Sequence, residues 1–185
     1  MARSTRAVLG AMLLLLCGSV FSGCAGYSRD PTQRTTGAVL DDQFIEMQVK
    51  RDIRKSDDGF RSAHLVVVSY NGVVLLAGQV ENERLRAQAE DVARQMRAVR
   101  RVHNELTIGG PISLPTRTAD SWLTAKVKTQ LLADDEVVAG HVKVVTENGI
   151  VYLMGMITRA EADRATEVAR SVFGVQKIVK VFEYL

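Results

Sequence analysis

The sequence predicts an α+β fold of two tandem αββαβ domains, each a three-stranded sheet with two helices on one face. Two stretches carry this prediction: Val142–Gly155 (VKVVTENGIVYLMG) and Leu65–Gly78 (LVVVSYNGVVLLAG). In each, two β-rich runs flank an Asn-Gly pair, at Asn71-Gly72 and at Asn148-Gly149. Asn-Gly favours the type I′ turn of a two-residue hairpin, because both central residues of that turn need a positive φ.

The order helix, strand, strand, helix, strand is stated twice along the chain. A spacing of about 77 residues aligns His64 with His141 and Gly78 with Gly155, while Phe44 aligns with Trp122. Several matches in one register indicate a tandem duplication, and a period this long suits two small domains better than a solenoid. Each domain is near the lower size limit for an independent core, so we expect the two to pack together.

Residues 1–23 are predicted to be a lipoprotein signal peptide. Arg3 and Arg6 precede a short apolar run, Ala7–Val20, which is too short to span a bilayer. The following Phe-Ser-Gly-Cys resembles a bacterial lipobox, so Cys24 is expected to become the acylated N-terminus, on the periplasmic side of the outer membrane. The alternative is an ordinary secretory leader in which Cys24 is incidental.

Without its leader, the chain has 22 basic and 21 acidic residues. This balance does not favour nucleic-acid binding, and it leaves only a local patch to bind anions. Residues 24–40 are predicted to be an acylated flexible tether, 41–108 the first domain, 109–119 a linker and 120–185 the second domain. The linker contains a Gly pair and two of the three prolines.

The helices of each domain are predicted from their caps and apolar periodicity. Asp41 or Asp42 is expected to cap the first helix, and Asp120 its counterpart in the second domain. Asn82 and Thr158 are expected to begin the second helix of each domain, with Thr158 in a capping box. The apolar positions of the two first helices are Ile45, Val49 and Ile53, and Leu123, Val127 and Leu131.

The fixed register of each hairpin assigns its side chains to two faces. Leu65, Val67, Val74 and Leu76 share the face expected to meet the helices. The opposite face of the first hairpin, with Val68 and Leu75, is too apolar for water and is expected to be covered by the other domain or by a partner. The equivalent face of the second hairpin carries Lys143, Glu147 and Tyr152, and is expected to tolerate solvent.

No pattern in the sequence indicates catalysis. The three histidines lack metal-ligand spacing, so no metal site is expected. There is no phosphate-binding loop or dinucleotide fingerprint, and no Ser-His-Asp or paired-carboxylate arrangement. We therefore expect no enzyme activity, no cofactor and no small-molecule substrate.

These motifs carry a family likeness. The two N-G-x-V/I hairpins ending in Gly78 and Gly155, and the Gly174-Val175 turn before the last strand, resemble the BON domain. Two such units behind a lipobox resemble the dual-BON outer-membrane lipoproteins. The resemblance covers residues 41–185. It implies a non-enzymatic, phospholipid-binding role in envelope integrity, with lipid contact on the first helix of the second domain.

That helix has residues suited to a bilayer interface. Trp122 precedes the core stripe by one position, and Lys126 lies one turn beyond it. An indole sits well at headgroup level, and an ammonium group attracts anionic phosphate. The predicted lipid-binding residues are Trp122, Leu123, Lys126, Lys128 and Thr129.

Two alternatives to lipid binding remain open from the sequence. Trp122 would instead pack under the linker or against the first domain. Separately, the apolar outer face of the first hairpin would suit an adaptor for outer-membrane assembly or division proteins, which would use its sheet faces and have lipid only as its anchor.

Overall fold

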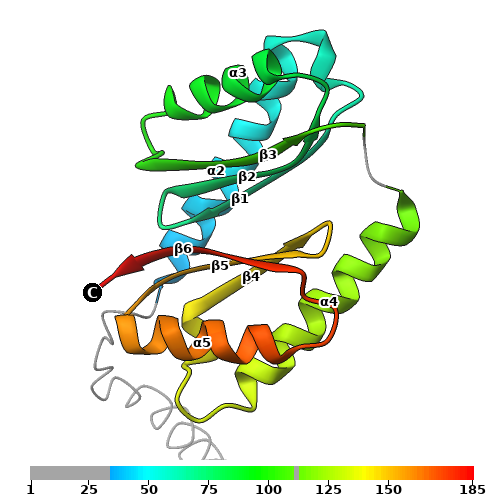
Figure 1. Ribbon diagram of the computed structural model, residues 1–185. Helices are drawn as coiled ribbons and strands as arrows, with labels where there is room; N and C mark the ends of the chain where they lie inside the picture. Colours follow the sequence, from blue (N-terminus) through cyan, green and yellow to red (C-terminus); the bar gives the residue numbers. More distant parts are fainter. Residues whose placement is uncertain (1–33, 111–112) are drawn as a thin grey trace, which may run out of the picture. The chain divides into compact units, whose positions relative to one another are not determined.

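Each predicted αββαβ unit is present in the computed structural model, which describes residues 34–110 and 113–185 (Figure 1). The first domain contains α2 (Thr36–Ser56), β1 (His64–Tyr70), β2 (Val73–Val80), α3 (Glu83–Arg94) and β3 (Arg101–Ile108). The second contains α4 (Leu114–Leu132), β4 (Val142–Glu147), β5 (Ile150–Ile157), α5 (Arg159–Ser171) and β6 (Lys177–Tyr184). Short 3₁₀ helices, Asp58–Phe60 and Ala139–His141, precede β1 and β4. The α+β fold is confirmed.

The two sheets have one topology. In the first, β2 is the central strand, paired antiparallel with β1 through the hairpin and parallel with β3. In the second, β5 takes the same place between β4 and β6. Parallel pairing requires a crossover, which α3 and α5 supply.

The hairpin turns have the predicted geometry. Asn71 and Gly72 have φ of 49° and 75°, and Asn148 and Gly149 have φ of 50° and 73°. Gly78 and Gly155 serve another purpose, since both lie inside a strand. A Cβ on Gly78 would lie 1.9 Å from the backbone oxygen of His64, so only glycine fits this close approach.

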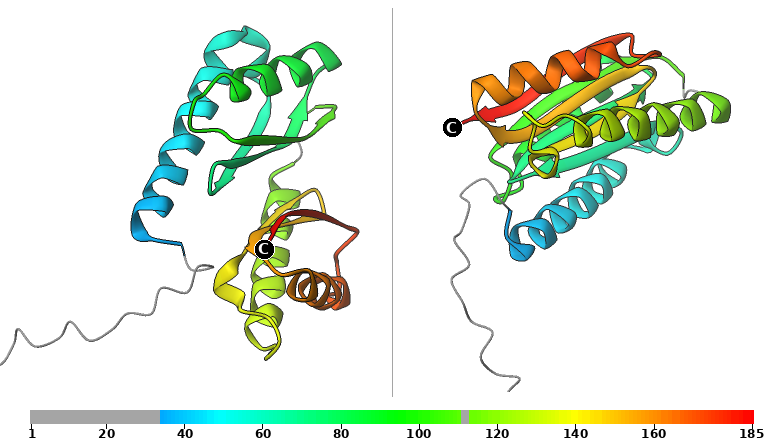
Figure 2. Two further views of the ribbon diagram at one scale, coloured as in Figure 1. Left: turned by 90° about the vertical axis from the view of Figure 1, so that its left-hand side faces the viewer. Right: turned by 90° about the horizontal axis from the view of Figure 1, so that it is seen from below.

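Three apolar clusters hold the molecule together. One lies between α2, α3 and the first sheet, and contains the predicted Ile45, Val49 and Ile53. Another lies between α4, α5 and the second sheet, and contains Leu123, Val127 and Leu131. The third joins the remaining faces of the two sheets, which lie face to face with the helices outside them (Figures 1 and 2).

The sheet-to-sheet cluster settles what covers the hairpins. Val68 and Leu75 pack against Tyr152 and Met154 of the second sheet, so the prediction that the other domain covers the first hairpin is confirmed. The expectation that the second hairpin's outer face tolerates solvent is wrong. Tyr152 and Glu147 are buried there. The helices of the second domain cover only the other face of its sheet, and this face packs against the first sheet.

Polar contacts surround this apolar interface. The Glu147 carboxylate accepts a hydrogen bond from Gln79 Nε2 at 2.9 Å and lies 3.2 Å from His64 Nε2. The Tyr70 hydroxyl donates to the backbone oxygen of His141 at 3.1 Å. Burial, followed by the nearby charges of Glu105 and Glu147, raises the pKa of Tyr152 to about 12.

The predicted helix caps require a correction. Thr35 caps α2 and Ser113 caps α4, so both helices begin several residues before the aspartates that were expected to cap them. The linker predicted over 109–119 therefore includes the first turns of α4. Asn82 and the capping box at Thr158 are confirmed.

The two aspartates instead hold the hairpin turns from within the helices. Asp42 accepts hydrogen bonds from the backbone N–H groups of Asn71 at 2.8 Å and Gly72 at 3.0 Å. Asp120 accepts the equivalent bonds from Asn148 at 2.8 Å and Gly149 at 2.9 Å. Each buried carboxylate thus ties the first helix of its domain to a turn about thirty residues further along the chain.

We predict that Asp42→Ala lowers the free energy of unfolding by about 2–4 kcal/mol, since a buried donor left without a partner costs on the order of 1–3 kcal/mol. Chemical denaturation measures this loss. The neighbouring Asp41 is exposed, and Asp41→Ala should change stability by less than about 0.5 kcal/mol. Equal effects of the two substitutions would contradict the role given to Asp42.

The same carboxylate should make stability depend on pH. Burial alone raises the pKa of Asp42, but hydrogen bonds from Ser69, Gly72, Asn71 and Arg34 outweigh it and hold the pKa below the ordinary 3.8. The unfolded chain therefore binds this proton more tightly. The ionised Asp42 carboxylate stabilises the fold fully above the ordinary pKa. This stabilisation is lost as the pH falls through the lower pKa of Asp42 in the folded protein. In Asp42→Asn this part of the acid dependence should disappear.

We also predict that Leu75→Asp destabilises the protein by more than about 3 kcal/mol, because it buries an unpaired charge between the sheets. Thermal unfolding followed by circular dichroism measures the effect. Val138 is an exposed valine of the second domain, and Val138→Asp is the matched control. A Leu75→Asp protein as stable as this control would show that the sheets do not pack on one another in solution.

Candidate membrane-binding surface

The periodicity of α4 positions Trp122 outside the core. Leu123, Val127 and Leu131 point into the second domain, and Trp122 lies about 100° around the helix from Leu123. Its side chain is 68% exposed. The alternative in which Trp122 packs under the linker or against the first domain does not agree with this exposure.

A second aromatic residue comes from the turn between α5 and β6. The Val175 N–H donates to the backbone oxygen of Val172 at 3.2 Å, and Gly174 has a φ of 107°, which closes the turn tightly. Phe173 is at the tip of this turn and is 92% exposed. A single exposed ring is common on protein surfaces, but exposed apolar side chains that lie together are typical of binding surfaces.

Lys126 connects the two aromatic residues. Its Nζ donates a hydrogen bond to the backbone oxygen of Phe173 at 3.2 Å, which draws the α5–β6 turn toward α4. A groove of about 410 Å³ lies between them. We call it the domain 2 groove; it is lined by Trp122, Ala125, Lys126, Thr129, Gln130, Ser171, Val172 and Phe173.

The other predicted lipid-binding residues divide into two groups. Thr129 lines the groove, and its hydroxyl donates to the backbone oxygen of Ala125 at 3.0 Å. Lys128 is exposed but does not line the groove. Leu123 is 6% exposed and belongs to the core of the second domain, so it is not part of this surface.

Sequence reasoning missed Phe173. A signal was nonetheless present in the repeat, because Phe173 aligns with Arg97 at the same position before the turn. The first repeat therefore has a cation where the second has an exposed ring. At this turn the two domains therefore share a fold but differ in surface chemistry.

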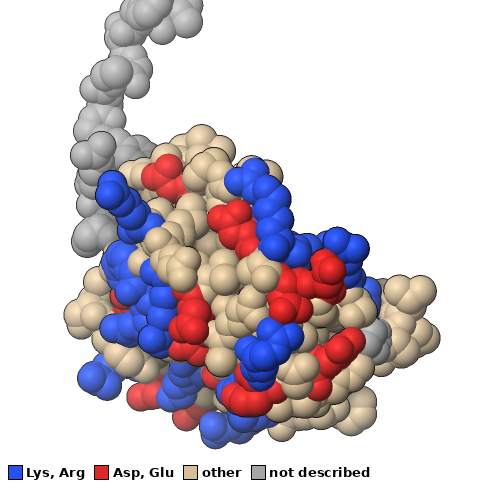
Figure 3. Space-filling view, turned by 90° about the horizontal axis from the view of Figure 1, so that it is seen from above, with Lys and Arg blue, Asp and Glu red and all other residues tan. Residues whose placement is uncertain are grey.

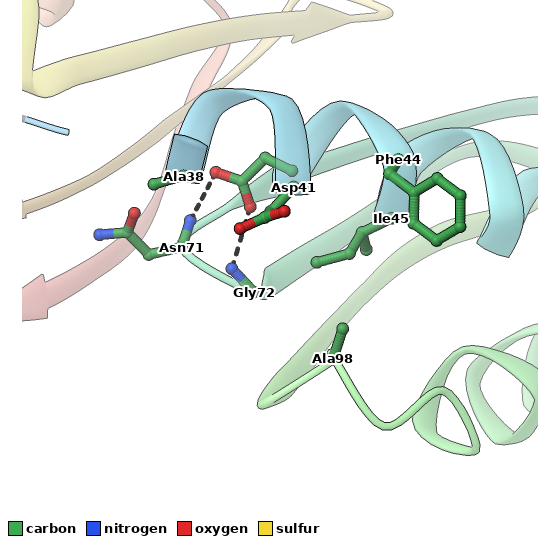
Figure 4. Close-up of a pocket in the computed structure, with 8 residues that line it drawn as sticks. Ala38, Asp41, Phe44, Ile45, Asn71, Gly72 and Ala98 are labelled. Carbon is green, nitrogen blue, oxygen red and sulfur yellow. Dashed lines mark hydrogen bonds between the residues drawn. The ribbon is translucent and has the colours of Figure 1, made fainter. Parts of the chain in front are cut away.

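The first domain has a related pocket of about 280 Å³ between α2 and the α3–β3 turn. Figure 4 shows Phe44 and Ile45 on α2, Ala98 on that turn, and the hairpin turn with Asn71 and Gly72 around the pocket. The dashed lines are the two hydrogen bonds that the Asp42 carboxylate accepts. Phe44, the counterpart of Trp122, is half exposed.

Within residues 34–110 and 113–185, no helix is long and apolar enough to cross a membrane. No group of three or more His, Cys, Asp or Glu side chains in the same part of the chain is arranged to hold a metal ion. Cys24 and its leader lie outside the described residues, and acylation at Cys24 remains a prediction.

Taken together, the fold and this surface are those of a tandem α+β repeat protein with an exposed aromatic and basic patch on its second repeat. The model of the BON domain matches residues 41–110 and 119–185. The chain therefore belongs to the BON-domain family.

Relatives match over most of their length. The chain is 39% identical to "Outer membrane lipoprotein DolP" of Haemophilus influenzae, covering 96% of this chain and 94% of that protein. It is also 39% identical to "21 kDa hemolysin" of Actinobacillus pleuropneumoniae, covering 86% and 82%. It is 32% identical to "Osmotically-inducible protein Y" of Escherichia coli, covering 83% and 78%. The protein is accordingly an outer-membrane protein with a role in the cell envelope.

Proposed function

We propose that the protein binds anionic phospholipid bilayers through the domain 2 groove and thereby supports outer-membrane integrity, without catalysing a reaction. The observation that carries the proposal is the pair of exposed rings, Trp122 and Phe173, on either side of Lys126. Aromatic residues with a neighbouring lysine suit the bilayer interface, where rings enter the headgroup layer and the ammonium group remains beside phosphate.

The expected energies are adequate for a second attachment. An aromatic side chain buries roughly 150–250 Å² when fully covered, and burial is worth about 25 cal/mol per Å² of apolar surface. Partial insertion of two rings therefore supplies a few kcal/mol, and a lysine near an anionic surface adds about 1 kcal/mol. This is weak binding for a free protein in solution.

An acyl anchor would make this weak contact effective. We propose that Cys24 is acylated, which leaves nine residues of chain between Cys24 and Arg34. Such a segment spans at most roughly 35 Å, so the domains would stay within reach of the bilayer. A second contact then forms at a high effective concentration, and even modest affinity keeps the domain 2 groove on the membrane.

The apolar face that suggested the adaptor alternative is not exposed in the structure. That alternative was based on the apolar outer face of the first hairpin, with Val68 and Leu75. Both side chains are buried in the cluster between the sheets and are not available to a partner protein. Lipid binding therefore has the stronger support.

The lipid proposal predicts a blue shift of tryptophan fluorescence when phosphatidylglycerol vesicles are added to the mature chain carrying Cys24→Ala. Trp122 is the only tryptophan, so the signal reports on the groove alone. Phe173→Ser should weaken vesicle binding at least tenfold, because about 1.4 kcal/mol of apolar burial corresponds to that factor. Lys126→Gln should reduce the preference for phosphatidylglycerol over phosphatidylcholine.

The matched control is Leu132→Ser. Leu132 is 74% exposed on the same helix but does not line the domain 2 groove, so its loss should leave binding unchanged. An unchanged fluorescence spectrum with saturating vesicles would refute the proposal. So would equal losses in Phe173→Ser and Leu132→Ser.

Acylation predicts a separate result in cells. The full chain with its leader should fractionate with the membranes and enter the detergent phase, and Cys24→Ala should move it to the aqueous phase. Cys17→Ala is the control, because that thiol lies within the predicted leader. If the Cys24→Ala and wild-type chains partition alike, Cys24 is incidental.

A further inference from the structure

Four arginines gather where the first domain turns from α3 into β3. They are Arg94, Arg97, Arg100 and Arg101. The equivalent positions of the second domain are Arg170, Phe173, Gln176 and Lys177. Since the second domain builds the same turn with only two cations, the backbone geometry does not require the arginines of the first.

Three of these arginines share a cleft. Arg94, Arg100 and Arg101 line a space of about 320 Å³ with Val99 and Val102, which we call the arginine cleft. Lys and Arg side chains gather along the left edge of the face in Figure 3, the side on which α3 runs into β3 in Figure 1. Arg94, Arg100 and Arg101 are therefore set around a cavity rather than spread over a helix face.

The backbone beneath the cleft is fixed. The Arg100 N–H donates to the backbone oxygen of Gly72 at 2.8 Å, and the Val99 N–H donates to that of Met96 at 2.9 Å. From Arg101 onward the chain is paired with β2. A preorganised backbone lowers the cost of arranging the arginine side chains around a ligand.

The positive charge of the cleft is only partly compensated. Arg94 pairs with Glu90, and Arg100 pairs with Glu183 from β6. Within the described part of the chain, neither Arg97 nor Arg101 has an ion-pair partner. Of the three arginines that line the cleft, only Arg101 has no carboxylate partner among the described residues, and Arg97 on the adjoining turn adds a second guanidinium without one.

The half-buried His103 senses the charge of Arg101. The pKa of His103 lies below its ordinary 6.5, first because of burial and next because of the positive charge of Arg101. The charges of Glu105 and Glu183 act on His103 in the opposite direction.

We propose that the arginine cleft is a phosphate-binding site. Guanidinium groups remain charged at every physiological pH and offer paired donors that match phosphate oxygens in a bidentate manner. The ligand is a phosphate ester, supplied either by a phospholipid headgroup or by a soluble molecule. This site lies on the first domain and does not depend on lipid binding by the domain 2 groove.

The test is a titration with sn-glycerol 3-phosphate, followed by ¹⁵N NMR of the mature chain carrying Cys24→Ala. The amides of residues 97–102 should shift in a saturable manner. In Arg97→Gln/Arg101→Gln, affinity should fall at least tenfold, and folding should be kept because neither side chain has an ion-pair partner among the described residues. Arg54→Gln/Lys55→Gln removes the same charge from the exposed end of α2 and should titrate like the wild type.

A second arm identifies the source of the phosphate. Phosphatidylglycerol vesicles are added to the protein carrying Trp122→Ala, which weakens the domain 2 groove. Residual binding that disappears with Arg97→Gln/Arg101→Gln supports a lipid headgroup, whereas glycerol phosphate binding without vesicle binding supports a soluble ester. The proposal is overturned if glycerol phosphate produces no saturable shifts, or if the double variant and the Arg54→Gln/Lys55→Gln control bind equally well.

Discussion

The packing of one sheet against the other is the interaction on which the rest of the molecule depends. A three-stranded sheet with helices on one face leaves its second face uncovered, and in both repeats the centre of that face is apolar. Leu75 and Tyr152 occupy equivalent positions of the two repeats and are both buried in the shared cluster. The burial of this cluster makes one unit of two domains that would each be marginal alone. It also leaves the helices and the turns beside them as the surfaces exposed to solvent.

Within each domain, a buried carboxylate fixes the relation of helix to hairpin. Asp42 and Asp120 accept hydrogen bonds from N–H groups of the two loop residues of each hairpin, which lie beyond the last paired residues of the strands. These contacts hold the first half of α2 and of α4 beside the α–β turn of the same domain. The two repeats therefore share one backbone arrangement around these turns, and they differ mainly in the side chains that the turns carry. Phe173 and Arg97 show this difference most directly.

Sequence reasoning gave the fold class, both hairpin turns and the apolar stripes, because these depend on local periodicity and on the Asn-Gly preference for a positive φ. It misplaced the starts of α2 and α4, since an aspartate just before an apolar run is also the usual sign of a helix cap. The true partners of Asp42 lie about thirty residues away, which no local pattern reveals. The position of Trp122 outside the core could be predicted, because it lies about 100° around the helix from the apolar stripe of α4. Phe173 was missed because its exposure follows from a tertiary turn, although comparison of the repeats distinguishes it from Arg97.

The sheet interface has a consequence for the history of the fold. Leu75 and Ala77 of the first repeat meet Tyr152 and Met154, which are their own counterparts in the second. An interface formed by equivalent positions is isologous, as in a symmetric homodimer. An ancestor with a single repeat would have had to cover its bare sheet with a second copy of itself. In a single chain the association of the two repeats does not depend on concentration, and the turn before the last strand of each repeat can carry different side chains, as Arg97 and Phe173 do.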